Sequence, residues 1–191
     1  MMTAPVDDPL KSGSRSDQEL IAAINDGDSN AFEALYYRYR DWVVSLAYRF
    51  TGDRELALDV LQETFLYFVK KFPGFRLTAQ LKTFLYPAVR NLSIAARRKA
   101  ERFQSHENET GTIEAAITTE PIVSQDESLT AAFALLSDEH REVLLLRFVD
   151  GLSLAEIADT INIPLGTVKS RLHNALASLR HDPRTRSYFA Q

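Results

Sequence analysis

The 191-residue chain contains no cysteine, which excludes disulfide bonds and thiolate metal ligands and suits a reducing cytosol. It has no apolar run near the roughly 18 residues that cross a membrane, and its first residues, MMTAPVDDPLKSGSRS, lack the apolar core of a signal peptide. Segments of strand periodicity are also missing, so no sheet is expected. The sequence predicts an all-α, soluble, cytoplasmic protein whose length suits two small helical domains.

Signatures of catalysis are equally scarce. The four histidines do not have metal-ligand spacing, no glycine-rich phosphate loop occurs, and no nucleophile stands in a pattern that suggests an activating base. We therefore expect no enzyme activity, no metal and no other cofactor. Asp59 and Glu63 lie four residues apart on one predicted helix face. They suit a solvated face or a docking surface for a protein partner, and periodicity does not choose between these two.

The formal net charge of −4 hides an uneven distribution along the chain. Residues 17 to 63 hold ten acidic and four basic residues, whereas residues 64 to 103 hold nine basic residues and one acidic residue. Residues 104 to 127 contain six acidic residues and no Lys or Arg, and residues 128 to 191 contain seven of each sign. These changes of sign indicate module boundaries, and the basic stretch is a candidate for binding a polyanion.

Apolar side chains at three- and four-residue steps predict a series of helices in both parts of the chain. Pro87 should divide the fourth helix into two segments that meet near Tyr86. Ser16 with Glu19, and Ser153 with Glu156, have the spacing of capping boxes. The expected helices are near 17–27, along an apolar stripe from Phe32 to Phe50, along a second stripe from Ala57 to Phe72, from about 79 to 102, and near 128–136, 138–149, 154–161 and 165–180. The expected domains are a disordered extension (1–16), a first helical domain (17–103), a flexible acidic linker (104–127), a second helical domain (128–181) and a tail (182–191).

The last two predicted helices, 154–161 and 165–180, are joined by Asn162-Ile163-Pro164, which is the short turn of a helix-turn-helix. In that motif the second helix enters the DNA major groove with its N-terminal part. A plain helical hairpin is the alternative, but the turn and the absence of acidic residues from 165 to 180 favour DNA binding. The polar side chains on the face opposite Val168 and Leu172 are Thr167, Lys169, Ser170, Arg171, His173 and Asn174.

Aromatic residues are interleaved with the basic residues from 64 to 103. Rings next to cations are typical of sites that bind single-stranded DNA, where bases stack and phosphates are neutralised. Most of these rings fall on the apolar stripe of a helix, and a core position is favoured for Phe65, Phe68, Phe72 and Phe84. Phe75 and Tyr86 are then the rings expected at the surface.

Two long segments carry a family resemblance. AFEALYYRYRDWVVSLAYRFTGDRELALDVLQETFLYFVKKFPGFR resembles region 2, and LLSDEHREVLLLRFVDGLSLAEIADTINIPLGTVKSRLHNALASLR resembles region 4, of the extracytoplasmic-function (ECF) group of sigma-70 family factors. The resemblance implies a protein that binds core RNA polymerase, through the β′ clamp helices and the β flap, and directs initiation at promoter DNA. It also implies control by an anti-sigma factor. The chain departs from the family pattern at Phe84, where tryptophan is usual, at Pro87, and at Ala95, where an acid is usual.

The resemblance also implies roles for individual residues. DVLQETF matches the segment that docks on the β′ clamp helices, which assigns polymerase binding to Asp59, Gln62, Glu63 and Phe65. The segment from 75 to 102 matches the part that melts and reads the −10 element, and the loop 73–80 is the candidate pocket for an extruded base. The implied −10 contacts are Arg76, Lys82, Phe84, Arg90, Asn91, Arg97, Arg98 and Lys99. The −35 contacts are Thr167, Lys169, Ser170, Arg171, His173 and Asn174.

Two other functions share parts of this pattern. A stand-alone helix-turn-helix regulator would have the same C-terminal motif but no need of the first domain. A sigma-like mimic that titrates an anti-sigma factor would have both domains but no need of nine basic residues from 64 to 103. Because the balanced charge of residues 128 to 191 gives little sequence-independent affinity for DNA, we expect the second domain to act together with the first.

Overall fold

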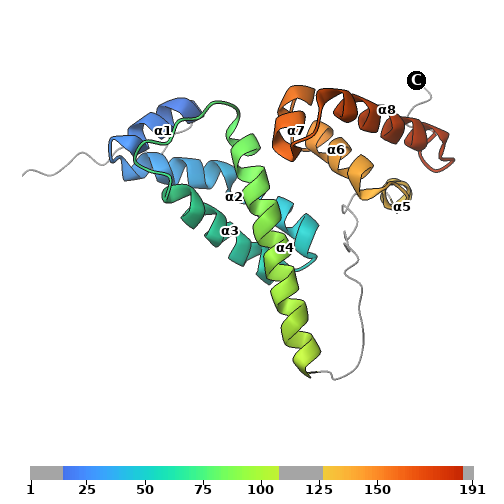
Figure 1. Cartoon of the computed structure of the whole chain (residues 1–191), viewed down its shortest axis with the longest axis horizontal. Coiled ribbons are helices and arrows are strands. Elements are labelled where there is room, and N and C mark those ends of the chain that lie inside the picture. The colour runs from blue at the N-terminus through green and yellow to red at the C-terminus, as the bar shows by residue number, and fades with distance from the viewer. Residues whose placement is uncertain (1–14, 108–126, 187–191) are drawn as a thin grey trace, which may run out of the picture. The chain divides into compact units, whose positions relative to one another are not determined.

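The computed structural model describes residues 15–107 and 127–186, and within these ranges all regular secondary structure is helical, as predicted. Contacts between Cα atoms divide the chain into two compact units, one with α1 to α3 and most of α4, the other with α5 to α8. Figure 1 labels the elements. Their bounds are α1 Asp17–Asn25, α2 Ser29–Thr51, α3 Arg54–Val69, α4 Leu81–Glu107, α5 Glu127–Ala134, α6 Asp138–Phe148, α7 Leu154–Ile161 and α8 Leu165–His181.

The first three helices begin at side-chain caps. Ser16 and Glu19 form the predicted capping box at the start of α1. The side chain of Asp28 accepts hydrogen bonds from the first amides of α2, and that of Asp53 does the same for α3. These carboxylates occupy backbone N–H groups that have no partner inside the helix. Gly52, with a φ of 66°, ends α2 in the left-handed conformation, so the chain reverses within two residues.

The first unit is built around the pair α2 and α3, which pack along their length, with α1 against α2. The apolar stripes read from the sequence form its core. Its buried side chains include Leu20, Leu35, Val43, Leu46, Val60, Phe68 and Val89. The Phe32 ring stacks on Phe68 with a centroid distance of 6.1 Å, so aromatic contacts link α2 to the end of α3.

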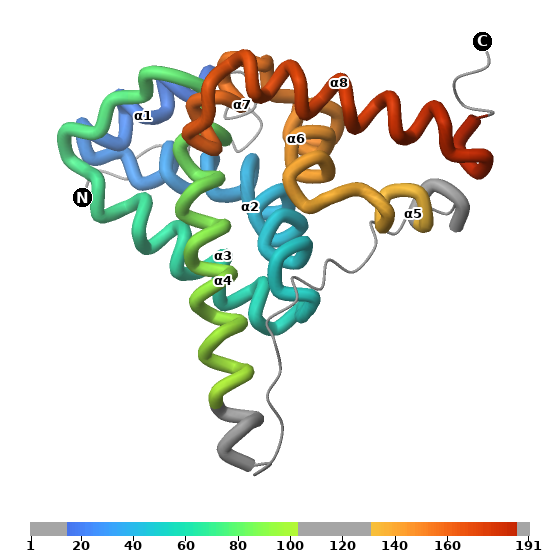
Figure 2. Tube along the Cα trace, turned by 45° about the vertical axis from the view of Figure 1, so that its right-hand side comes forward, coloured from blue at the N-terminus to red at the C-terminus, as the bar shows by residue number. Residues whose placement is uncertain are grey.

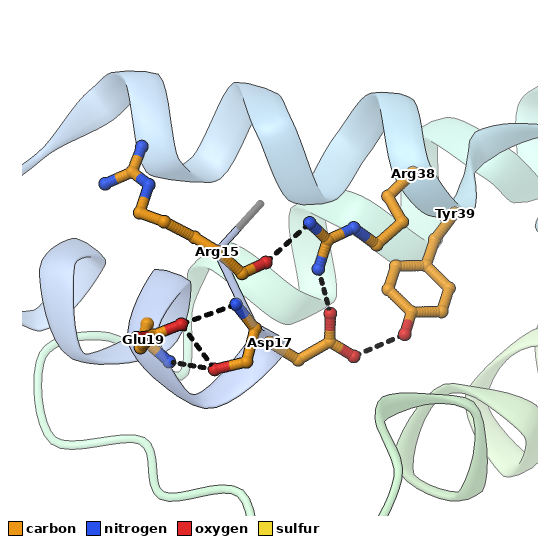
Figure 3. Close-up of polar contacts among 6 residues, drawn as sticks. Arg15, Asp17, Glu19, Arg38 and Tyr39 are labelled. Atoms are coloured by element: carbon orange, nitrogen blue, oxygen red, sulfur yellow. Dashed lines mark hydrogen bonds and ion pairs between the residues drawn. The ribbon is translucent and has the colours of Figure 1, made fainter. Parts of the chain in front are cut away.

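The N-terminal end of α1 is held on α2 by polar contacts (Figure 3). Nη1 of Arg38 donates to Oδ1 of Asp17 at 2.6 Å, and the Tyr39 hydroxyl donates to the other oxygen of the same carboxylate. Nη2 of Arg38 also donates to the carbonyl of Arg15 at 2.8 Å. Burial raises the pKa of the Tyr39 hydroxyl, and its bond to Asp17 raises that pKa further. With Leu20 and Ile21 buried, these contacts fix the short helix in place.

Two predictions about α4 need correction. The helix runs without a break through Pro87 and does not divide into two segments near Tyr86. Proline removes one backbone hydrogen bond, and the bonds on either side, with Leu81 and Val89 buried, keep the flanking turns helical. The helix also continues to Glu107, so the predicted linker (104–127) begins inside it. Most of that linker, residues 108–126, lies outside the described residues, as do the predicted N-terminal extension up to residue 14 and residues 187–191 of the tail.

The second unit packs α6, α7 and α8 around a small core, with α5 along its edge. The predicted bounds of α7 are those observed, and the capping box of Ser153 and Glu156 is present. Arg141 extends its guanidinium from α6 to the end of α5, where it donates to the carbonyls of Phe133 and Leu136. The core cluster consists of Ala132, Leu136, Leu144, Ala175 and Leu179.

The turn between α7 and α8 has the geometry of a helix-turn-helix. Asn162 ends α7 with a φ of 54° and a ψ of 51°, a left-handed conformation that asparagine tolerates better than most residues. Pro164 is the N-cap of α8, so its missing N–H costs no helical bond. Ala158, 9% exposed, is small where the chain turns back. Three residues therefore separate the two helices of the motif.

Candidate nucleic-acid and polymerase interfaces

The outward face of α8 carries most of the side chains predicted to read DNA. Val168, Ala175 and Leu179 are buried, and a 100° step per residue places the opposite face near Ser170. Lys169, Ser170, His173 and Asn174 are all exposed on that side. A Cβ added at Gly166, near the start of α8, would meet no atom within 4 Å. The N-terminal half of α8 thus presents a cation, a hydroxyl, an imidazole and an amide to a partner, groups that bond base edges and phosphates.

Arg171 and Thr167 lie elsewhere on α8. Both are half-buried at the edge of the helix, and Nη2 of Arg171 forms an ion pair with Oε2 of Glu139 at 2.8 Å. Glu139 is in the first turn of α6, 32 positions earlier in the chain. The structure therefore does not bring Arg171 together with the four outward residues. Spacing along a single helix gives no information about a partner on another helix.

Three of the four predicted polymerase contacts share a surface of α3. Asp59, Gln62 and Glu63 are exposed, within slightly more than one helical turn. Phe65 does not join them, because it is 5% exposed. Its ring packs against Tyr36 at a centroid distance of 4.8 Å and against Phe32 at 6.2 Å. The structure thus places Phe65 in the core, which agrees with the apolar stripe and not with a direct contact to a partner.

A groove of about 320 Å³ lies between α3 and α4. Asp59 and Glu63 line it from α3, and Lys99 lines it from α4. Its remaining lining residues are Leu56, Val60, Ala95, Ala96 and Ala100. Because three alanines stand on α4, the groove has an apolar floor with two carboxylates and one ammonium at its sides. Lys99, predicted as a DNA contact, therefore shares a site with the predicted polymerase contacts.

The other predicted DNA contacts of α4 lie on different faces of the helix. Val89, Ser93 and Leu85 are buried, and the 100° step places Asn91 and Arg98, both exposed, opposite them. Arg90 and Arg97 fall on the edge away from Lys99. Nε of Arg97 forms an ion pair with Oε1 of Glu101 one turn later, at 2.8 Å. The outward face of α4 is thus a polar and cationic strip of Asn91 and Arg98, with Arg90 and Arg97 along one edge.

The residues before this strip are partly enclosed. Arg76 is exposed in the loop between α3 and α4, whereas Lys82 and Phe84 are half-buried at the start of α4. Phe75, predicted to be exposed, is half-buried, with ring centroids 5.5 Å from both Phe68 and Phe72. Tyr86, also predicted to be exposed, is buried. Both predictions were wrong. For Phe75 the reason is that a sequence does not reveal which rings a loop folds back upon.

The resolved pKa shifts belong to groups that hold the fold together. Burial disfavours the Asp28 carboxylate, but hydrogen bonds from Arg15 and from the first amides of α2 outweigh this and lower its pKa. Hydrogen bonds from the backbone and side chain of Ser16 lower the pKa of Glu19. Among the described residues no three His, Cys, Asp or Glu side chains gather as a metal site would require. In the same ranges no helix has both the length and the apolar character needed to cross a membrane.

Taken together, two helical units, one with a helix-turn-helix and one with a cationic helix, define a multi-domain DNA-binding protein. Residues 35–103 match the family "Sigma-70 region 2", and residues 132–181 match the family "Sigma-70, region 4". Among curated relatives, the ECF RNA polymerase sigma factor SigW of Bacillus subtilis is 31% identical over 173 residues, 84% of this chain and 92% of that protein. SigL of Mycobacterium tuberculosis is 38% identical over 152 residues, 77% of this chain and 85% of its own. The chain belongs to the ECF group of the sigma-70 family of RNA polymerase sigma factors.

Solved structures agree on the fold. The sigma factor RpoE of Bartonella quintana, in complex with the anti-sigma factor NepR, superposes with a TM-score of 0.57 at 24% identity, over 78% of this chain and 94% of that one. CnrH in complex with the cytosolic domain of CnrY gives a TM-score of 0.60 at 21% identity, over 85% and 93% of the two chains. The all-α fold predicted from the sequence is thereby confirmed, and the predicted membership of the ECF group is confirmed by the family matches and the curated relatives.

Proposed function

We propose that this ECF sigma factor binds core RNA polymerase through α3 and reads promoter DNA with one helix from each unit. The observation that carries the proposal is the outward face of α8, where Lys169, Ser170, His173 and Asn174 are exposed while the opposite side of the helix is buried. A helix with this division, directly after a tight turn, suits insertion into the major groove. The chain then acts as a binding subunit and not as an enzyme, inside the cytoplasm where the polymerase works.

For the −35 element we assign base contacts to Asn174 and Ser170, because amide and hydroxyl groups bond base edges in the major groove. Lys169 suits a phosphate. His173 lies on the same face and is a further contact. Thr167 and Arg171 lie at the edge of α8, and we assign them to orientation of the helix.

For the −10 element we assign strand contacts to the outward strip of α4. Arg98 and Asn91 are exposed there, and Arg90 and Arg97 follow along one edge. Cations and an amide along one side of a helix suit the phosphates of a separated strand. The loop 73–80, which includes Arg76, is the proposed pocket for an extruded base, with Lys82 and Phe84 at its helical end.

For the polymerase we assign the α3 surface of Asp59, Gln62 and Glu63 together with Lys99 across the groove. The proposed partner is the β′ clamp, while the β flap would receive the second unit. The apolar side chains of Leu58 and Leu66 are 44% and 57% exposed on α3, and apolar side chains exposed beside polar ones suit a protein partner. Because two structural relatives are anti-sigma complexes, an anti-sigma factor is a second proposed partner for this surface.

The test is run-off transcription with purified core polymerase on a library of promoters, with and without the full chain. We expect specific initiation only when the chain is present and only on templates with two elements about two helical turns apart. A stand-alone regulator would instead bind duplex DNA tightly without polymerase, and a mimic that titrates an anti-sigma factor would bind that factor but initiate nowhere. Either result would overturn the proposal.

A further inference from the structure

The loop between α3 and α4 is held by one side chain from α1. Asn25, the last residue of α1, receives a hydrogen bond from the backbone N–H of Gly74 on Oδ1 at 2.6 Å. Its Nδ2 donates to the carbonyl of Phe75 at 2.9 Å. The loop thus offers one N–H donor and one carbonyl acceptor on adjacent residues. The Asn25 carboxamide can bond both, because it carries an acceptor oxygen and a donor NH₂ group. Figure 2 shows the loop passing beside α1, although about 50 residues separate them in sequence.

We call the two hydrogen bonds of Asn25 to residues 74 and 75 the Asn25 clamp. The conformation of the loop agrees with this clamp. Gly74 has a φ of 100°, a value that favours glycine, so its N–H points where an ordinary residue would seldom direct it. On the inner side the Phe75 ring packs at 5.5 Å from Phe68, which is fully buried. The backbone of residues 74 and 75 is thus held on one side by Asn25 and on the other by the core. Arg76, the next residue, is exposed.

The helix that carries Asn25 is held against α2 at its start and in its middle. α1 is fixed at its start by the contacts of Asp17 with Arg38 and Tyr39 (Figure 3). Its middle is fixed by the burial of Leu20 and Ile21. Asn25 is half-buried at the other end of α1. Because α1 is held on α2, Asn25 has a fixed position from which it bonds the loop between α3 and α4.

We infer that Asn25 is a positioning residue for base recognition: it holds the loop 73–80 in the one conformation that presents Arg76 and its neighbours to an extruded base. The inference rests on the proposed function of this loop in −10 recognition. A loop of this length without the clamp would sample several conformations, and selectivity requires that the wrong base meet a fixed surface. Removal of the clamp should lower selectivity at the base that the loop reads, while polymerase binding by α3 stays the same.

The experiment uses the full chain with core polymerase on promoters randomised across the −10 element, and sequences the transcripts. Asn25→Ala removes both bonds, and Asn25→Asp, which is nearly isosteric, keeps the acceptor but sets a carboxylate against the Phe75 carbonyl. Because each net hydrogen bond contributes about a factor of five, we expect a loss of selectivity at one or two positions of about fivefold in Asn25→Asp and up to about 25-fold in Asn25→Ala. The matched control is Asn30→Ala, an exposed asparagine at the start of α2, which should keep the wild-type preferences.

In a third variant, residues 73–80 are replaced by a Gly/Ser spacer. This variant distinguishes failure of the proposed function of the loop from failure of the inference about Asn25. If the spacer leaves every base preference intact, the loop does not read DNA and the proposed function of the loop fails. If the spacer abolishes a preference that Asn25→Asp leaves intact, while that variant binds polymerase as the wild type does, only the clamp is refuted. A loss of polymerase affinity in Asn25→Asp equal to its loss of initiation would also refute the inference, because the residue would then act on the whole unit.

Discussion

Oε2 of Glu139 lies 2.8 Å from Nη2 of Arg171, so the first turn of α6 is joined to the second turn of α8. The carboxylate is 65% exposed and the guanidinium 21% exposed. An arginine predicted from sequence to contact DNA thus has its charge directed at a neighbouring helix. The pair adds a polar contact to the buried side chains that set the rotation of α8 about its axis, and that rotation decides which side chains face outward.

We predict that Glu139→Gln and Arg171→Ala each lower the free energy of unfolding by less than about 1 kcal/mol, because the pair is partly exposed. A double-mutant cycle by urea unfolding should give a coupling of the same size. Initiation on −35 variants should weaken for both but keep its base preferences, with Asp159→Asn on α7 as control. A change of preference at a single base pair in Arg171→Ala, comparable with that of Asn174→Ala, would make Arg171 a base contact after all.

The groove between α3 and α4 leads to a prediction about polymerase affinity. The double variant Asp59→Asn, Glu63→Gln keeps the side-chain shapes but removes two charges from a proposed interface, so affinity for core polymerase should fall about tenfold or more. Fluorescence anisotropy of labelled chain gives the dissociation constant, and circular dichroism should report unchanged helix content. Glu33→Gln, an exposed carboxylate on α2, is the control. Equal losses in the control and the double variant would point to net charge and not to this surface.

Lys99 and Arg98 are adjacent in sequence but lie on different faces, and salt dependence should separate them. With a pre-melted promoter, Arg98→Ala should reduce the slope of log affinity against log salt by about 0.7, the value for one phosphate contact on a single strand. Lys99→Ala should leave that slope as it is and weaken polymerase binding instead. The assignment of the two faces is wrong if Lys99→Ala changes the slope and Arg98→Ala does not.

The Tyr39 hydroxyl supports a prediction about alkaline stability. Burial and the bond to Asp17 raise its pKa, so the neutral form is favoured in the folded state. This contribution to stability is complete below the unfolded pKa of about 10 and is lost as the pH rises above it. Urea unfolding at about pH 8 and about pH 11 should show a fall in the free energy of unfolding, and this fall should be smaller in Tyr39→Phe, which has no hydroxyl to titrate. Because Tyr39→Phe also lacks the bond to Asp17, the two chains are compared by the size of the fall and not by their stability at about pH 8. An identical fall in both chains would mean that other groups cause it.

Local patterns predicted most of the helices, because a helix start depends on residues within one turn. The capping boxes of Ser16 and Ser153 and the turn at Asn162 are all of this kind. Two predictions about α4 failed. The break at Pro87 was expected from one lost hydrogen bond, but the turns on both sides of Pro87 remain helical. The sequence also did not predict that α4 continues to Glu107, because the last residues of the helix do not carry a stripe of apolar side chains.

For the candidate site, too, local patterns predicted some residues correctly and missed those that depend on the tertiary fold. Exposure of Asp59, Gln62 and Glu63 could be anticipated from periodicity, and so could the outward face of α8. The periodic pattern also placed Phe65 in the core, where the structure has it, while the motif placed it at an interface. Asn25 and Glu139 were not among the predicted residues, because their partners are Gly74, Phe75 and Arg171 on other elements. Pairings over 30 to 50 residues depend on the tertiary fold.

The outward residues of α8 have one more consequence. Lys169, Ser170, His173 and Asn174 are exposed, whereas the residues that seat the helix are Val168, Ala175 and Leu179. Under the proposed reading of the −35 element, promoter preference and folding are encoded at different positions of one helix. A duplicated gene for such a chain could acquire a new set of target promoters by exchanging these four side chains, while its stability and its attachment to polymerase stayed as they were.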